Sequence, residues 1–135
     1  MAFDPNRHYP LGGLRPDVVR TPAGRPLAEV TLEAARRGVL TADEMRATGE
    51  TLLLQAAVAR AAGRTQLADN LERAAELTAV PDEELLAVYT ALRPGRSTAA
   101  ELEAWAVALE RRGASRTAAF VREASAAHDE RGLGA

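Results

Sequence analysis

The 135-residue chain contains no cysteine and no lysine. The absence of cysteine excludes a disulfide framework, a thiol nucleophile and a thiolate metal site. The absence of lysine means that all 17 basic residues are arginine, the cation best suited to fixed, bidentate contacts with carboxylates. A GC-rich genome would produce the same bias, so the arginines alone do not establish a binding surface.

Long apolar segments are also missing. No apolar run approaches the roughly 20 residues that span a membrane, and no charged segment followed by an apolar one opens the chain as in a secretory signal. The formal net charge of −2 provides no general attraction to nucleic-acid phosphates. We therefore expect a cytoplasmic protein with neither a membrane nor a nucleic acid as partner.

Aromatic residues are few, since only Phe3, Tyr9, Tyr89, Trp105 and Phe120 are present. Alanine is abundant instead; it favours helix but buries little apolar area per residue. The length suits one domain, yet an alanine-rich core is thin and leaves room for a partner to supply burial. Trp105 falls on the apolar stripe of its helix, which favours core packing over a role as an interface peg.

Five of the seven prolines lie within residues 1–26. Proline fixes φ and removes an amide donor, so this segment cannot be a long helix. Apolar residues such as Tyr9 and Leu11 are interspersed, which is not typical of a floppy tail. The pattern predicts an extended N-terminal arm over residues 1–26 that lies on a surface, either of its own domain or of another subunit.

Residues 27–135 are predicted to form a single all-α domain of about five to six short helices, because no segment alternates with period two. The expected elements are a helix over 27–37, a capped turn over 41–46, and helices over 48–62, 65–78, 81–92, 98–112 and 115–131. Thr41 with Glu44, and Thr98 with Glu101, are capping-box patterns. Glycines 38, 63 and 113 are expected to end helices.

No catalytic, metal or cofactor site is evident. Asp82, Glu83 and Glu84 are consecutive, so on a helix they point in different directions and instead suit the positive end of the helix dipole. His8 and His128 lack the orienting partner that a general base requires. Gly12-Gly13 does not have the spacing of a dinucleotide-binding loop.

The turn Arg93-Pro94-Gly95-Arg96 is harder to interpret, because two arginines flank a rigid turn. They either cap the carbonyls of the preceding helix or reach carboxylates of a partner. The sequence leaves both interpretations open.

Several blocks of the chain form a specific pattern, and the most specific run extends from Glu72 through Arg73 and Glu76 to Asp82. The other blocks are 9–11 with Pro16, Val19 and Thr21; 41–46; 50–52; 55–56; 62–64; Asn70; 91–94; 96–98; 118–124; and 130–131. Together these blocks, which span residues 9–131, resemble the small subunit of adenosylcobalamin-dependent diol and glycerol dehydratases.

The resemblance implies a non-catalytic small subunit that stabilises a large catalytic barrel subunit, within an enzyme that dehydrates a vicinal diol to an aldehyde. Adenosylcobalamin would bind between the large and medium subunits, and none would bind to this chain. The complex would be a dimer of heterotrimers, with the large subunit as the direct partner. The candidate interface residues are Tyr9, Leu11, Arg73, Glu76, Arg93, Arg96 and Arg122.

Gly49, Gly95 and His128 depart from the residues common in that family, which affects only local contacts. The eight residues before Tyr9 make the chain similar in length to the glycerol dehydratase type, without the longer leader of some diol dehydratase small subunits. A free-standing helical adaptor or homodimer is the alternative. The preference for glycerol or propane-1,2-diol would be set in another subunit.

Overall fold

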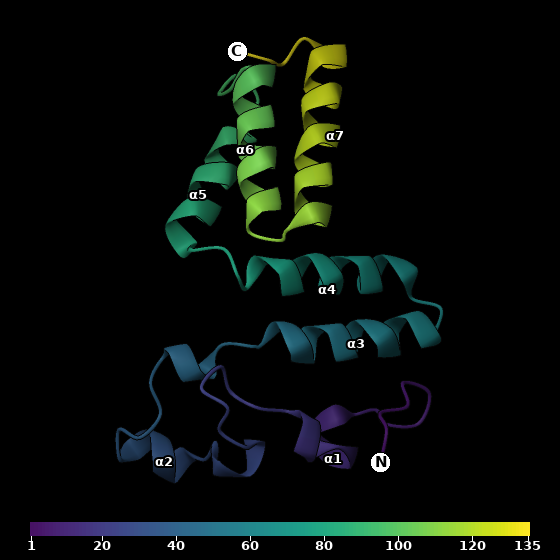
Figure 1. Ribbon diagram of the computed structural model, residues 1–135, viewed down its shortest axis with the longest axis vertical. Coiled ribbons are helices and arrows are strands. Elements are labelled where there is room, and N and C mark those ends of the chain that lie inside the picture. The colour runs from purple at the N-terminus through teal and green to yellow at the C-terminus, as the bar shows by residue number, and fades with distance from the viewer. The chain divides into compact units, whose positions relative to one another are not determined.

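The computed structural model describes residues 1–135 and confirms the predicted all-α class. It contains α-helices and 3₁₀ helices, with no strand beyond an isolated bridge between Arg20 and Pro26. The chain divides into two compact units, Met1–Ala75 and Glu76–Ala135, so the predicted boundary after residue 26 lies inside the first unit. Figure 1 shows the helices of both units.

The N-terminal arm is built from short turns. Helix α1 covers Leu11–Leu14, and the 3₁₀ helix η1 covers Pro16–Val18. Pro16 stands at the first position of η1, where its missing amide hydrogen costs nothing. The arm therefore combines extended backbone with these turns, and it belongs to the same compact unit as the helices that follow.

The prediction of one helix over residues 27–37 is wrong in one respect, because the structure has two separate elements there. The 3₁₀ helix η2 covers Leu27–Glu29, and helix α2 covers Leu32–Arg36. The break falls at Thr31, which adopts extended backbone angles and accepts a hydrogen bond from the Ala34 amide through its side chain. Threonine is a good N-cap residue, so this start signal lay inside the predicted helix.

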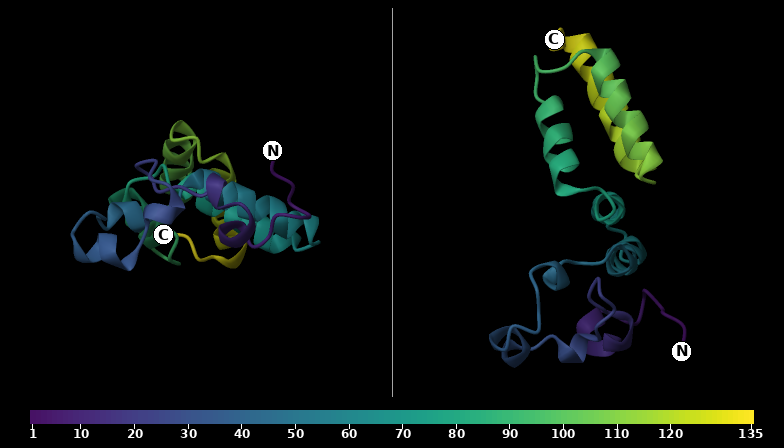
Figure 2. Two further views of the ribbon diagram at one scale, coloured as in Figure 1. Left: turned by 90° about the horizontal axis from the view of Figure 1, so that it is seen from below. Right: turned by 60° about the vertical axis from the view of Figure 1, so that its left-hand side comes forward.

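Helices α3 (Gly49–Ala61) and α4 (Thr65–Leu77) follow the 3₁₀ helix η3 (Asp43–Met45). Thr48 caps α3 by accepting a hydrogen bond from the Thr51 amide at 3.1 Å. Figures 1 and 2 show α3 and α4 running antiparallel side by side. Arg60 of α3 joins them, since its Nη2 lies 3.0 Å from Asp69 and 2.8 Å from Glu72 of α4.

The second unit contains helices α5 (Asp82–Ala91), α6 (Ala99–Arg111) and α7 (Ser115–Arg131). Thr98 and Glu101 form the predicted capping box at the start of α6. Gly113, with φ of 81°, allows the tight turn after which α7 runs antiparallel to α6 (Figures 1 and 2). Pro81 is the N-cap of α5 rather than its first residue.

One hydrophobic cluster forms the core of the second unit. Leu102 and Val121 are its largest fully buried side chains. Trp105 packs against the cluster, which agrees with the core role inferred from its position on the helix. The remaining buried members are Val80, Val88, Ala106, Leu109, Ala114 and Ala118.

Candidate partner interface

Glu76 caps a helix of its own unit. Its carboxylate accepts hydrogen bonds from the amides of Arg116 at 3.1 Å and Thr117 at 3.0 Å, and from the Thr117 hydroxyl at 3.1 Å. The N-cap residue of α7 is Ala114, which has no side-chain acceptor. Glu76 therefore satisfies amides that helix starts leave unpaired, and its carboxylate is engaged inside the chain.

Arg122 joins the two longest helices of the second unit. Its Nε donates to Glu103 Oε2 at 2.9 Å, and its Nη1 donates to Glu110, both on α6. These hydrogen bonds hold the pKa of Glu103 and of Glu110 below the usual range of a glutamate. The guanidinium of Arg122 is therefore also used within the chain.

Two further candidate residues serve internal packing. Arg73 is partly buried and donates from Nη2 to Asn70, one turn earlier on α4. Leu11 is only 5% exposed, because it is turned into the first unit, and it offers almost no surface to another protein. The structure therefore gives both side chains a contact or a place within the chain, and their role at an interface stays a prediction.

The arm has a polar centre that the sequence analysis missed. Arg15 is 9% exposed and binds Asp17 through two hydrogen bonds, Nε to Oδ1 at 2.8 Å and Nη2 to Oδ2 at 2.7 Å. Its Nη1 also donates to the Ala2 carbonyl at 3.3 Å. These contacts lower the pKa of Asp17. The Arg-Pro-Asp spacing was the available signal for this pairing.

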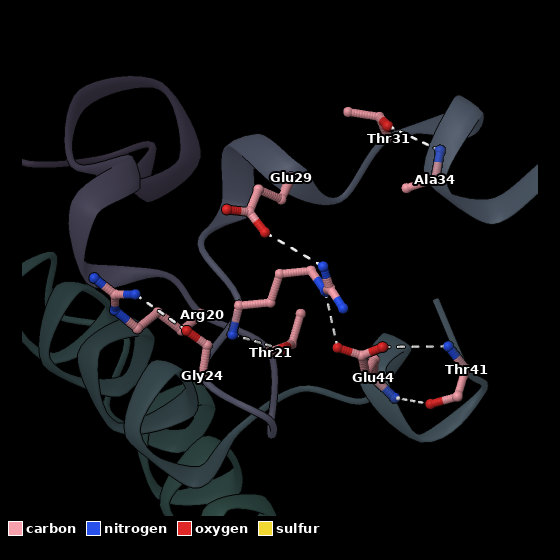
Figure 3. Close-up of polar contacts among 9 residues, drawn as sticks. Arg20, Thr21, Gly24, Glu29, Thr31, Ala34, Thr41 and Glu44 are labelled. Carbon is pink, nitrogen blue, oxygen red and sulfur yellow. Dashed lines mark hydrogen bonds and ion pairs between the residues drawn. The ribbon is translucent and has the colours of Figure 1, made fainter. Parts of the chain in front are cut away.

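A second ion pair ties residue 25 of the arm to the capped turn at η3. Arg25 Nε donates to Glu44 Oε1 at 3.0 Å, and its Nη1 donates to Glu29 at 3.3 Å. Glu44 also accepts from the Thr41 amide at 3.4 Å, as Figure 3 shows. The hydrogen bond from Arg25 lowers the pKa of Glu44. The arm thus lies on its own unit, one of the two surfaces considered from the sequence.

Tyr9 borders an open groove of about 370 Å³. The groove is otherwise lined by residues of α3, α4 and their connection, namely Gln55, Val58, Ala59, Ala62, Arg64, Leu67 and Leu71. Tyr9 is 68% exposed and Leu67 is 40% exposed. Tyr9 therefore lies beside the helices of its own unit and still presents most of its side chain to solvent.

Arg93 and Arg96 are exposed, and neither side chain makes a hydrogen bond or ion pair within the chain. The carbonyls at the end of α5 are served by backbone amides instead, since the Leu92 amide donates to Thr90 and Val88. The two arginines therefore do not cap the preceding helix. The other alternative left open by the sequence, a contact with carboxylates of a partner, stays a prediction.

No group of three or more histidine, cysteine, aspartate or glutamate side chains could hold a metal ion. The imidazole Nδ1 of His8 accepts from the Asp4 amide at 2.9 Å, which gives this histidine a local structural role. None of the helices has both the length and the apolar character required to cross a membrane.

The family model described as "Dehydratase small subunit" matches residues 5–133. The chain belongs to the dehydratase small-subunit family. Two similar proteins are named propanediol dehydratase small subunit, one from Citrobacter freundii and one from Salmonella typhimurium. Each is 52% identical over 124 residues, covering 91% of this chain and 72% of the relative. These findings confirm the resemblance predicted from the sequence.

The match to the dehydratase small-subunit family covers most of the arm and of both compact units, and it includes every candidate interface residue. Within that set, Arg73, Glu76 and Arg122 are engaged inside the chain and Leu11 is buried. Tyr9, Arg93 and Arg96 are the candidates whose side chains are exposed. A surface for another subunit is therefore best sought around these three.

Proposed function

We propose that this chain is a non-catalytic small subunit of an adenosylcobalamin-dependent diol or glycerol dehydratase, and that it stabilises the large catalytic subunit. The enzyme would convert a vicinal diol into an aldehyde and water. The names of the two relatives support this activity and favour propane-1,2-diol as the substrate. The chain would act in the cytoplasm, within a dimer of heterotrimers that also contains a medium subunit.

The observation that carries this proposal is that several charged side chains are engaged in contacts within their own unit. Glu76 caps a helix, while Arg15, Arg25 and Arg122 are each bound to carboxylates of the same unit. A general base or nucleophile needs a free partner within hydrogen-bond reach of a substrate. The carboxylates and arginines of this chain support a structural role instead.

The two described grooves of this chain do not fit adenosylcobalamin. The two described grooves are open and have volumes of about 230 and 370 Å³. Pockets for drug-sized ligands span roughly 300–1,000 Å³, and a corrinoid is several times larger than such a ligand. We therefore assign the cofactor to the other subunits and no step of the reaction to this chain.

Co-expression tests the proposal. This chain, produced together with the large and medium subunits of such a dehydratase, is expected to co-elute with the large subunit in size-exclusion chromatography. Omission of the chain should lower the yield of soluble, active enzyme. A monodisperse small subunit that never associates with the large one, or full activity and yield without it, would contradict the proposal and favour a free-standing adaptor.

A further inference from the structure

Helix α5 presents an outer face that its own unit leaves uncovered. Leu86 and Tyr89 are each 68% exposed, and Arg93 follows at the spacing that places all three on one side of the helix. A different side of the helix carries Leu85, which packs with Leu92 against the core cluster. Tyr89 follows Leu85 by four residues, a spacing that would suit the inner side, yet its side chain is exposed.

The charged side chains of this stretch are all basic. Residues 85–100 contain Arg93 and Arg96 but no aspartate or glutamate. The acidic residues that flank this stretch are both engaged elsewhere, Glu84 with Arg112 at 2.6 Å and Glu101 with the Thr98 amide at 2.8 Å. On the face itself the nearest carboxylate is that of Asp82, about 16 Å from Arg93 along the helix axis.

The turn that carries the two arginines is held in place from behind. The Gly95 amide donates to the Leu133 carbonyl at 2.7 Å, and the Ala135 amide donates to the Ser97 carbonyl at 3.1 Å. Gly95 has φ of 76°, a conformation that favours glycine. A turn that is fixed before binding loses less conformational entropy when a partner engages its side chains.

We infer that Leu86, Tyr89, Arg93 and Arg96, the α5 docking face, bind the large subunit of the dehydratase at a site where carboxylates border an apolar depression. This inference rests on the proposed function and names the surface that performs it. Tyrosine and arginine are the residues that most often dominate the energy of an interface. The two exposed cations make no ion pair within the chain, so they are free to meet carboxylates of a partner.

A second copy of this chain is a poorer occupant of the α5 docking face. A twofold interface brings the same patch of both copies together. Arg93 and Arg96 of each copy would then approach their counterparts, with no carboxylate of residues 85–100 to compensate. Like charges that meet at an interface suppress association.

Competition for the large subunit tests the inference with the whole complex. Differently tagged wild-type and variant chains are co-expressed with the large and medium subunits, and their ratio in the purified complex is measured. Tyr89→Ala, and the double variant Arg93→Gln/Arg96→Gln, are each expected to lower incorporation roughly tenfold or more. The arginine variant should also make dissociation of the complex less sensitive to salt, because rim charges govern that dependence.

Matched controls lie outside the α5 docking face. Leu53→Ala removes an apolar side chain that is 52% exposed, and Arg111→Gln/Arg131→Gln removes two exposed cations without partners. The controls are expected to incorporate like the wild type. Equal losses in the controls and in the docking-face variants would overturn the inference.

A photo-crosslinking amino acid in place of Tyr89 identifies the occupant. A crosslink to the large subunit supports the inference, whereas a crosslink to the medium subunit or to a second small subunit overturns it. Wild-type incorporation of all docking-face variants would refute this surface while leaving the proposed function intact. Failure of the wild-type chain itself to enter the complex would instead refute the proposed function.

Discussion

At the scale of single residues, Glu76 replaces a missing cap. The start of α7 has alanine at its N-cap position, and the carboxylate of Glu76 takes over the amides that a serine or aspartate would bind there. Glu76 and Thr117 are 41 residues apart in the chain. No local pattern in the sequence signals a cap delivered from so far away.

Glu76→Ala is expected to lower the free energy of unfolding of the second unit by about 1–2 kcal/mol, because it leaves two α7 amides without an acceptor. Urea denaturation followed by circular dichroism measures this change. Glu123→Ala is the matched control, since Glu123 is an exposed glutamate on α7 without a partner in the chain. A control variant that is destabilised as much as Glu76→Ala would argue against the capping role.

At the scale of helices, the starts and ends were largely predictable because their signals are local. Helix α7 covers Ser115–Arg131, the range expected from Gly113 and the sequence periodicity. The capping boxes at Thr41 and Thr98 are present in the structure. The break before α2 was missed because the apolar spacing of residues 27–37 suits one helix as well as two.

The pairing of α6 with α7 through Arg122 has a consequence for acid stability. Because the pKa of Glu103 and of Glu110 is lowered in the folded state, their contribution to stability is present above the unfolded pKa near 4.5 and is lost as the pH falls through the lower, folded values. Below about pH 4.5, the free energy of unfolding of Arg122→Met should therefore depend less steeply on pH than that of the wild type.

Urea titrations between about pH 3 and 6 measure this dependence. Arg111→Met serves as the control, because this substitution removes one arginine from α6 without breaking a contact with either glutamate. At low pH, the free energy of unfolding of this control is expected to fall as it does in the wild type. If Arg122→Met and the wild type lose stability in parallel on acidification, the ion pairs do not act as described.

At the scale of the whole molecule, the two compact units differ in their cores. The buried apolar residues of Met1–Ala75 are Leu11 and the alanines 56, 59, 68 and 75. The second unit buries Leu102, Leu109 and Val121, with Trp105 packed against them. Because alanine buries little apolar area, the first unit gains less stability from its own core than the second unit does.

Hydrogen exchange of the intact chain is expected to reflect this difference. Amides of α6 and α7 should be protected about tenfold or more over those of α2 and η3, because regions with few buried apolar contacts open at lower cost. Mass spectrometry of peptides from the exchanged protein provides the measurement. Equal protection in the two regions would show that the alanine-rich unit is as stable as the other.

The sequence by itself determined the helical class, most helix limits and the family, because caps, glycine stops and specific residue blocks are local signals. Tertiary structure decided which candidate side chains remain free. Arg122 and Glu76 form hydrogen bonds with residues distant in the sequence. Leu11 is buried, whereas Arg93 and Arg96 are exposed. The physical reason is that burial and pairing depend on which helices meet, and no short segment of sequence carries that information.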